Sequence, residues 1–141
     1  MKNNNLFPLN GVRICIEEKS PAILGMAYSP LSKEPIHFTD IGQLLILLDA
    51  LFDEVGYPQS FQDKRSFNKD SARDNRYSGR PSPKTDPVTV ASYHGKLTSF
   101  TLIVDSRRDS SWQGMILSKD DEIIGSFDGD MDLMKLIFSN L

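Results

Sequence analysis

Residues 23–52 of the chain read ILGMAYSPLSKEPIHFTDIGQLLILLDALF, and they predict two short strands followed by a helix. The strands are expected at Ile23–Ser29 and around Pro35–Phe38, where apolar runs are bounded by turn residues. Thr39 or Asp40 is a suitable N-cap for the helix. Apolar residues recur along it at helical spacing and form one broad face: Ile41, Leu44, Leu45, Leu48, Leu51 and Phe52.

A further strand precedes this segment at Val12–Glu17, where Ile14 and Ile16 fall on one face. Gly56 and Pro58 are expected to end the helix. Residues 1–56 therefore read as a strand, strand, strand, helix unit.

The same pattern returns after 89 residues, a shift that places Arg13–Phe52 on Leu102–Leu141 without a gap. Identical residues coincide in seven pairs: Ile14 and Ile103, Gly25 and Gly114, Met26 and Met115, Ser29 and Ser118, Phe38 and Phe127, Leu44 and Leu133, and Leu47 and Leu136. Because repeats determine how a whole chain folds, we interpret the pattern as an internal duplication.

The second unit, residues 93–141, is expected to repeat the order of the first. It contains predicted strands at Thr98–Asp105, Trp112–Ser118 and Glu122–Phe127, a turn at 107–110, and a helix from Met131 to Asn140. The sequence thus predicts an α+β fold, in which two tandem β-β-β-α repeats pack about a pseudo-two-fold axis.

Residues 57–92 are rich in Ser, Asp, Asn, Lys, Arg and Pro, and we expect them to form a long flexible connector. The connector carries a charge of +3, which leaves −6 on the rest of a chain whose net charge is −3. It is interpreted either as a solvated tether or as a binding arm that contacts phosphates. Its basic residues are Lys64, Arg65, Lys69, Arg73, Arg76, Arg80 and Lys84. So long a connector permits a monomer or a swapped homodimer.

Few residues carry the patterns that catalysis or metal binding requires. His37 and His94 stand alone, and Cys15 lies in an apolar strand, so we expect no enzyme activity and no cofactor. The acidic residues Asp128, Asp130 and Asp132 are interpreted as capping a helix rather than holding a metal, although a metal stays an open alternative.

Composition and hydropathy exclude several classes of protein. The apolar run Ile41–Phe52 is far shorter than the roughly 20 residues that span a bilayer. The first residues lack the apolar region of a secretory signal, and the single cysteine cannot form an internal disulfide. We therefore expect a cytoplasmic protein without membrane contact.

Trp112, the only tryptophan, follows Arg107 and Arg108 closely. It is expected to fill the core, or else to anchor an interface together with these arginines, because Trp and Arg are enriched at binding hot spots.

The step Ser111-Trp112-Gln113-Gly114, followed by Phe127 and a Leu133–Ile137 helix, resembles a group of small Firmicutes proteins. Tyr57-Pro-Gln-Ser-Phe is similar to their connector. The resemblance implies an origin in gut bacteria and their mobile elements, and it carries over no established activity or catalytic residue. The chain departs from the group at Asp128-Gly129-Asp130, where a basic or serine-rich helix start is more usual.

From these observations we expect a non-catalytic protein-binding module whose partner is a host protein or ribonucleoprotein. The resemblance to mobile-element proteins favours an inhibitor of a host nucleic-acid machine, of the anti-CRISPR type. The alternative is a nucleic-acid-binding module that uses the basic connector, whose affinity for nucleic acid would fall steeply with salt.

Overall fold

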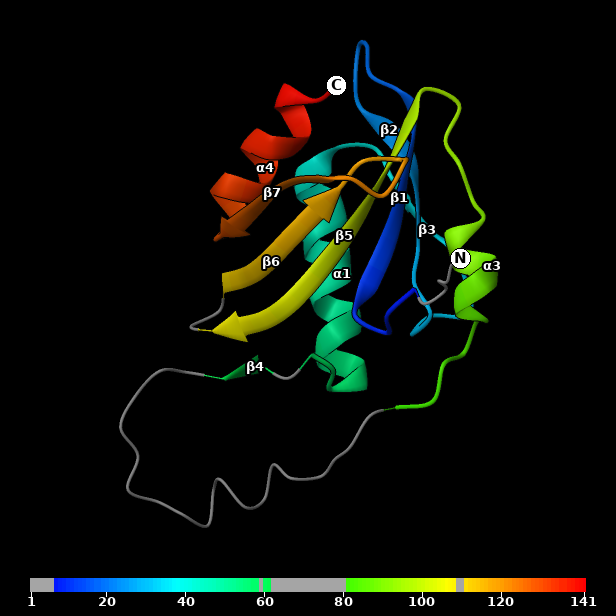
Figure 1. The fold of residues 1–141 in the computed structure, drawn as a ribbon, viewed down its shortest axis with the longest axis vertical. Helices are drawn as coiled ribbons and strands as arrows, with labels where there is room; N and C mark the ends of the chain where they lie inside the picture. Colours follow the sequence, from blue (N-terminus) through cyan, green and yellow to red (C-terminus); the bar gives the residue numbers. More distant parts are fainter. Residues whose placement is uncertain (1–6, 59, 62–80, 109–110) are drawn as a thin grey trace.

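The computed structural model of the chain (Figure 1) describes residues 7–58, 60–61, 81–108 and 111–141. In this part of the chain seven strands and three helices form. They are β1 (Gly11–Glu18), β2 (Leu24–Tyr28), β3 (Ile36–Phe38), α1 (Ile41–Val55), β4 (Ser60–Phe61), α3 (Pro87–Ala91), β5 (Thr98–Arg108), β6 (Ser111–Leu117), β7 (Ile123–Asp128) and α4 (Asp130–Ser139).

One mixed sheet organises the chain, with the strand order β3-β2-β1-β5-β6-β7. All neighbours along this path are antiparallel, and the short β4 pairs in parallel with the end of β5. The predicted α+β class is therefore confirmed. The central strands β1 and β5 bring together residues far apart in the chain, such as Ile14 opposite Phe100.

Helix α1 begins and ends where the sequence predicts. The Asp40 carboxylate accepts a hydrogen bond from the Gln43 N–H at 2.8 Å, and the Gln43 side-chain oxygen accepts one from the Thr39 N–H at 2.7 Å. This reciprocal pair satisfies two N–H groups that helix geometry leaves without a partner. At the other end Gly56 adopts φ 79° and donates its N–H to the Phe52 carbonyl.

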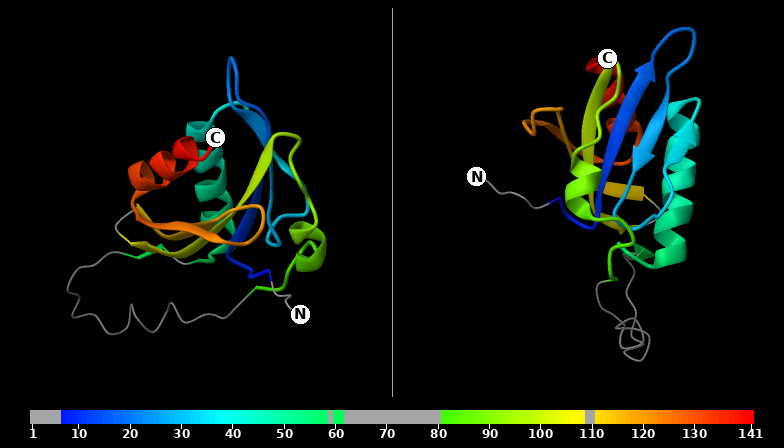
Figure 2. Two further views of the ribbon diagram at one scale, coloured as in Figure 1. Left: turned by 45° about the horizontal axis from the view of Figure 1, so that its top comes forward. Right: turned by 90° about the vertical axis from the view of Figure 1, so that its right-hand side faces the viewer.

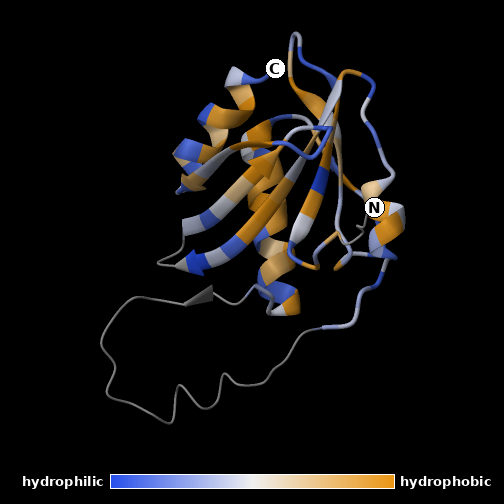
Figure 3. Cartoon of the chain, viewed as in Figure 1, coloured by the Kyte–Doolittle hydropathy of each residue, from blue (hydrophilic) through white to orange (hydrophobic). Residues whose placement is uncertain are grey.

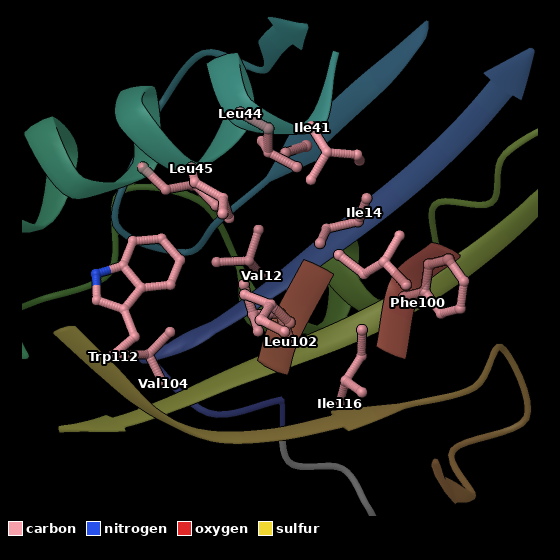
Figure 4. Close-up of a cluster of buried hydrophobic side chains, with 14 of the residues drawn as sticks. Val12, Ile14, Ile41, Leu44, Leu45, Phe100, Leu102, Val104, Trp112 and Ile116 are labelled. Carbon is pink, nitrogen blue, oxygen red and sulfur yellow. The ribbon is translucent and has the colours of Figure 1, made fainter. Parts of the chain in front are cut away.

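The core lies between one face of the sheet and the helices α1 and α4, which Figure 2 (left) shows beside each other. The apolar face of α1 is buried as predicted, except that Leu51 is only half-buried. Figure 3 shows α1 as largely hydrophobic, and Figure 4 shows its leucines facing the central strands. Strand β6 alternates between buried and half-buried residues, because only one of its faces meets the helices.

Residues 84–92 form part of the fold, where the sequence suggested a flexible connector. Helix α3 lies on the sheet face opposite α1 (Figure 2, right), and its Val90 is fully buried. The Tyr93 ring then stacks on Tyr28 with 3.8 Å between centroids, and the Lys84 N–H donates to the Pro30 carbonyl at 2.7 Å. A buried valine, a stacked ring and hydrogen bonds from Lys84 and Thr85 to the Pro30 carbonyl hold the segment, and composition reveals none of these contacts. Most of the predicted connector, residues 62–80, lies outside the described residues.

One predicted boundary is wrong, and one predicted cap is present only in part. Strand β5 continues through Arg107 and Arg108, where a turn was predicted, and these residues pair with both β4 and β6. Positions 109–110 of the predicted turn lie outside the described residues. Asp130 and Asp132 lie in the first turn of α4, where the sequence predicts acidic residues, but Gly129 precedes the helix at φ 116° and no side chain caps it. Instead Asp132 accepts a hydrogen bond from the backbone N–H of Asp128 at 3.2 Å.

Candidate functional site

Arg107 joins the end of strand β5 to helix α1. Its guanidinium is 3% exposed and bonds the carboxylates of Asp53 at 2.8 Å and Asp49 at 3.2 Å. Its Nε donates to the carbonyl of Pro58 at 2.7 Å, and the guanidinium lies 5.5 Å from the centroid of the Phe52 ring. Both carboxylates are more than half exposed, so Arg107 places two acidic groups at the surface of α1.

Trp112 lies on β6 beside this cluster and is 3% exposed. Its indole N–H donates to the Asp49 Oδ1 atom at 3.0 Å, and its ring lies at 59° to that of Phe52, with 5.5 Å between centroids. Figure 4 shows the indole next to Leu45, with its nitrogen turned away from the cluster of aliphatic side chains. The indole therefore contributes an apolar body to the core and a polar edge to the surface.

A groove opens over Trp112 between helices α1 and α4. It has a volume of about 170 Å³ and is lined by Leu45, Ile46 and Asp49 of α1, Trp112 of β6 and Asp130 of α4. We refer to these five residues as the helix groove. Its lining combines apolar side chains with two carboxylates from different helices.

The two carboxylates of the helix groove affect each other. Burial raises the pKa of Asp130, the negative charge of Asp49 raises it further, and a hydrogen bond with the Trp112 backbone opposes both effects. Desolvation and a like charge each disfavour an ionised carboxylate. The ionised form of Asp130 is therefore energetically unfavourable in the groove.

Large apolar side chains stand exposed on the same two helices. Ile46 on α1 is 71% exposed, and Met131, next to Asp130 on α4, is 67% exposed. Leu47 and Phe138 are exposed to a smaller extent. Isolated exposed apolar residues are ordinary, but here Ile46 is also part of the lining of a groove, together with Leu45 and Trp112, and apolar residues gathered in this way are found at interaction surfaces.

The chain outside residues 57–92 is acidic overall. Outside residues 57–92 the chain carries −6, and two of the arginines in that part, Arg13 and Arg107, are buried. Arg13 lies under the α3 segment, where it donates to the carbonyl of Tyr93 at 2.8 Å and to the hydroxyl of Thr101 at 2.8 Å, and it lies 3.2 Å from the ring nitrogen of His94. Acidic side chains therefore outnumber basic ones in this part of the chain, and Asp49 and Asp130 are the acidic residues that line the groove.

The structure brings together only some of the binding residues that the sequence suggested. Arg107 and Trp112 both donate to Asp49 of the helix groove, and both are buried rather than exposed as anchors. Arg108 ends β5, and Lys84 is exposed beside α3 on the opposite face of the sheet. The others lie outside the described residues: Lys64, Arg65, Lys69, Arg73, Arg76 and Arg80.

The remaining candidates for chemistry are separated from each other. His37 is exposed on β3, whereas Cys15 is buried on β1, and burial raises the pKa of the Cys15 thiol. In the described parts of the chain, no group of three or more His, Cys, Asp or Glu side chains is placed to hold a metal ion, and this applies to Asp128, Asp130 and Asp132.

Sequence reasoning missed Ile46, Asp49 and Asp130 as groove residues. One signal was present, because Ile46 and Leu47 lie off the apolar face predicted for the helix at 41–52 and yet are large and apolar. Such residues outside the buried stripe of a helix must face solvent or a partner.

Comparison with protein-family models, with curated proteins and with solved structures found no match to this chain. Among the described residues, no helix combines the length and the apolar character needed to cross a membrane.

Proposed function

We propose that this chain is a non-catalytic protein-binding module that docks on a basic surface of its partner through the helix groove. One observation carries the proposal: Ile46, 71% exposed, lies in a groove that also contains Asp49 and Asp130. Apolar side chains supply affinity when a partner removes them from water, and a surrounding excess of one charge selects partners of the opposite charge.

The acidic character of the fold supports an inhibitor of a host nucleic-acid machine as the more specific function. A protein that binds nucleic acid presents Lys and Arg to the phosphates, so its binding surface is basic. A module with an acidic, partly apolar face is complementary to such a surface and would compete with nucleic acid for it. The resemblance to mobile-element proteins favours the same function, of the anti-CRISPR type, acting in the cytoplasm.

Affinity capture with a matched pair of variants tests the proposal. The tagged chain and its I46R and I123R variants are incubated with a lysate of a Firmicutes bacterium, with and without nuclease, and captured proteins are identified by mass spectrometry. Ile123 is a suitable control because it is 66% exposed at the start of β7, away from the groove. The proposal predicts a protein that wild type and I123R capture despite nuclease, and that I46R does not.

Two outcomes would contradict this function. Equal capture by I46R and wild type would show that the partner binds elsewhere. Capture that disappears with nuclease would favour the alternative, a nucleic-acid-binding module that uses the basic connector.

We also infer that the two halves of the chain are repeats related by a pseudo-two-fold axis. Support comes from the 89-residue shift, which places β1, β2, β3 and α1 on β5, β6, β7 and α4. Gly25 lies opposite Phe38 and Gly114 opposite Phe127, so the same glycine and phenylalanine pair recurs at that shift. In addition, the register shifts between Ile16 and Glu18 in β1 and between Val104 and Ser106 in β5.

A further inference from the structure

Of the two carboxylates that line the helix groove, Asp49 is paired with a basic side chain among the described residues and Asp130 is not. Arg107 is the cation that bonds Asp49 and Asp53, and both bonds come from its Nη1 atom. Within the described residues, no basic side chain forms an ion pair with Asp130. One guanidinium therefore pairs with Asp49 and Asp53, and Asp130 has no such partner in this part of the chain.

Asp49 retains an oxygen for a further contact. The bonds that it accepts from Arg107 and from the indole of Trp112 both end on Oδ1. Each oxygen of a carboxylate has two acceptor positions, so Oδ2 is available to a donor that enters the groove. Asp130 offers a second carboxylate from α4, on the other helix that borders the groove.

The apolar part of the lining fits a long side chain. Leu45, Ile46 and Trp112 supply the hydrocarbon surface, and the volume of about 170 Å³ is several times the roughly 30 Å³ that a water molecule occupies in the liquid. Arginine buries a three-carbon stem along apolar surface while its planar guanidinium donates to carboxylates and lies against aromatic rings. Lysine has a more strongly hydrated point charge and no planar face.

We propose that the helix groove binds one arginine side chain of the partner, with its guanidinium held by Asp49 and Asp130 and its stem against Trp112 and Ile46. The biological role of this arginine rests on the proposed function. Its recognition by the groove is a property of this chain alone, and is measured without the partner.

The sole tryptophan provides the measurement, because the indole N–H of Trp112 gives a single NMR signal and lies at the groove. The ¹⁵N-labelled chain is titrated with N-acetyl-arginine methylamide and, in parallel, with the corresponding citrulline compound, which has the same shape without the charge. The arginine compound is expected to shift the indole signal in a saturable way, whereas the citrulline compound leaves it in place. The lysine compound is expected to bind several-fold more weakly.

Two variants place the binding site. D130N removes one of the carboxylates and is expected to weaken binding of the arginine compound about fivefold or more. D132N is the control, because Asp132 is on the same turn of α4 but accepts a bond from the backbone of Asp128 rather than lining the groove. A citrulline response equal to that of arginine, or unchanged affinity in D130N, would overturn the proposal.

The result is independent of the partner experiment. Saturable arginine binding together with undiminished capture by I46R would retain the arginine site and refute the proposed function. Loss of capture in I46R together with equal responses to arginine and citrulline would do the reverse.

Discussion

The guanidinium of Arg107 on β5 bonds the carboxylate of Asp53 on α1 at 2.8 Å, and it also bonds that of Asp49, 58 positions earlier in the chain, at 3.2 Å. This contact fixes helix α1 to the end of the strand that forms the centre of the sheet. Since the carbonyl of Pro58 receives a third bond from Arg107, the residues that follow α1 are held by the same side chain. The position of Asp49 in the helix groove therefore depends on a buried arginine on a neighbouring strand.

Replacing Arg107 with methionine is expected to lower the free energy of unfolding by about 2 kcal/mol. Methionine retains an apolar stem, but the buried Pro58 carbonyl loses its donor. The lost ion pairs add little, because Asp49 and Asp53 are more than half exposed and water screens them. Urea denaturation measures the change. K135M, on an exposed site of α4, is the control and should alter stability by less than about 0.5 kcal/mol; an equal loss in both variants would contradict the assignment.

Gly114 is required for the close approach of β6 to β5. A Cβ at this position would collide with the carbonyl oxygen of Ile103 and would lie 3.1 Å from the ring of Phe127. G114A is expected to cost about 3 kcal/mol or to prevent folding, because the obstacle is backbone. G42A, in the first turn of α1, should change stability by less than about 1 kcal/mol. Thermal denaturation of both compares them, and a G114A variant as stable as wild type would refute the packing argument.

Asp40 caps the helix that carries half of the groove. D40A removes the carboxylate that accepts the Gln43 N–H, and we expect a loss of about 1 kcal/mol in the free energy of unfolding. D40N keeps an acceptor in the same place and should stay within about 0.5 kcal/mol of wild type. If D40N destabilises as much as D40A, charge rather than capping is the cause.

The raised pKa of Asp130 predicts how stability depends on pH. A carboxylate with a raised pKa in the folded state is unfavourable when ionised, so D130N should be more stable than wild type at neutral pH. The advantage should shrink as pH falls through the raised pKa and vanish below the ordinary value of 3.8, where the carboxylate is protonated in both states. Because Asp130 is exposed, we expect less than about 1 kcal/mol.

Melting temperatures of wild type and D130N between pH 3 and pH 7 measure this effect. The charged neighbour that raises the pKa of Asp130 is Asp49 on α1. The other charged residues on the adjoining elements are Arg107 on β5, Asp128 at the end of β7 and Asp132 in the first turn of α4. A difference in melting temperature that is constant with pH, or that grows toward acid pH, would contradict the prediction.

The sequence predicted those elements that local patterns determine. The caps of α1 at Asp40 and Gly56 are set by residues within one turn of the helix, and its buried face follows from spacing alone. Arg107 and Arg108 were placed in a turn because they are polar in sequence, yet they end β5, and Arg107 is buried by contacts with α1 and Pro58 that no local pattern encodes. Tertiary contacts overrode the local preference.

The helix groove could not be predicted from the sequence for the same reason, because its residues are far apart in the chain. Trp112 and Asp49 are 63 positions apart, and they meet only because α1 packs on the face of the sheet on which Trp112 of β6 is buried. A pattern read along the chain shows that Ile46 is exposed, but it does not show that Asp130 lies across from it. Residues 84–92 were missed because the burial of Val90 and the hydrogen bonds of Lys84 and Thr85 to Pro30 all depend on residues distant in the chain.

Photo-crosslinking from Ile46 in the helix groove, and from Met131 next to Asp130, shows whether a partner docks there. A photoreactive phenylalanine analogue replaces Ile46, Met131 or, as the control, Ile123, which are 71%, 67% and 66% exposed. Each variant is irradiated in nuclease-treated lysate, and adducts are identified by mass spectrometry. If a partner docks on the helix groove, the same protein is joined to positions 46 and 131, through a segment that contains arginine, and none is joined to position 123. Adducts from position 123 alone, or none from positions 46 and 131, would contradict it.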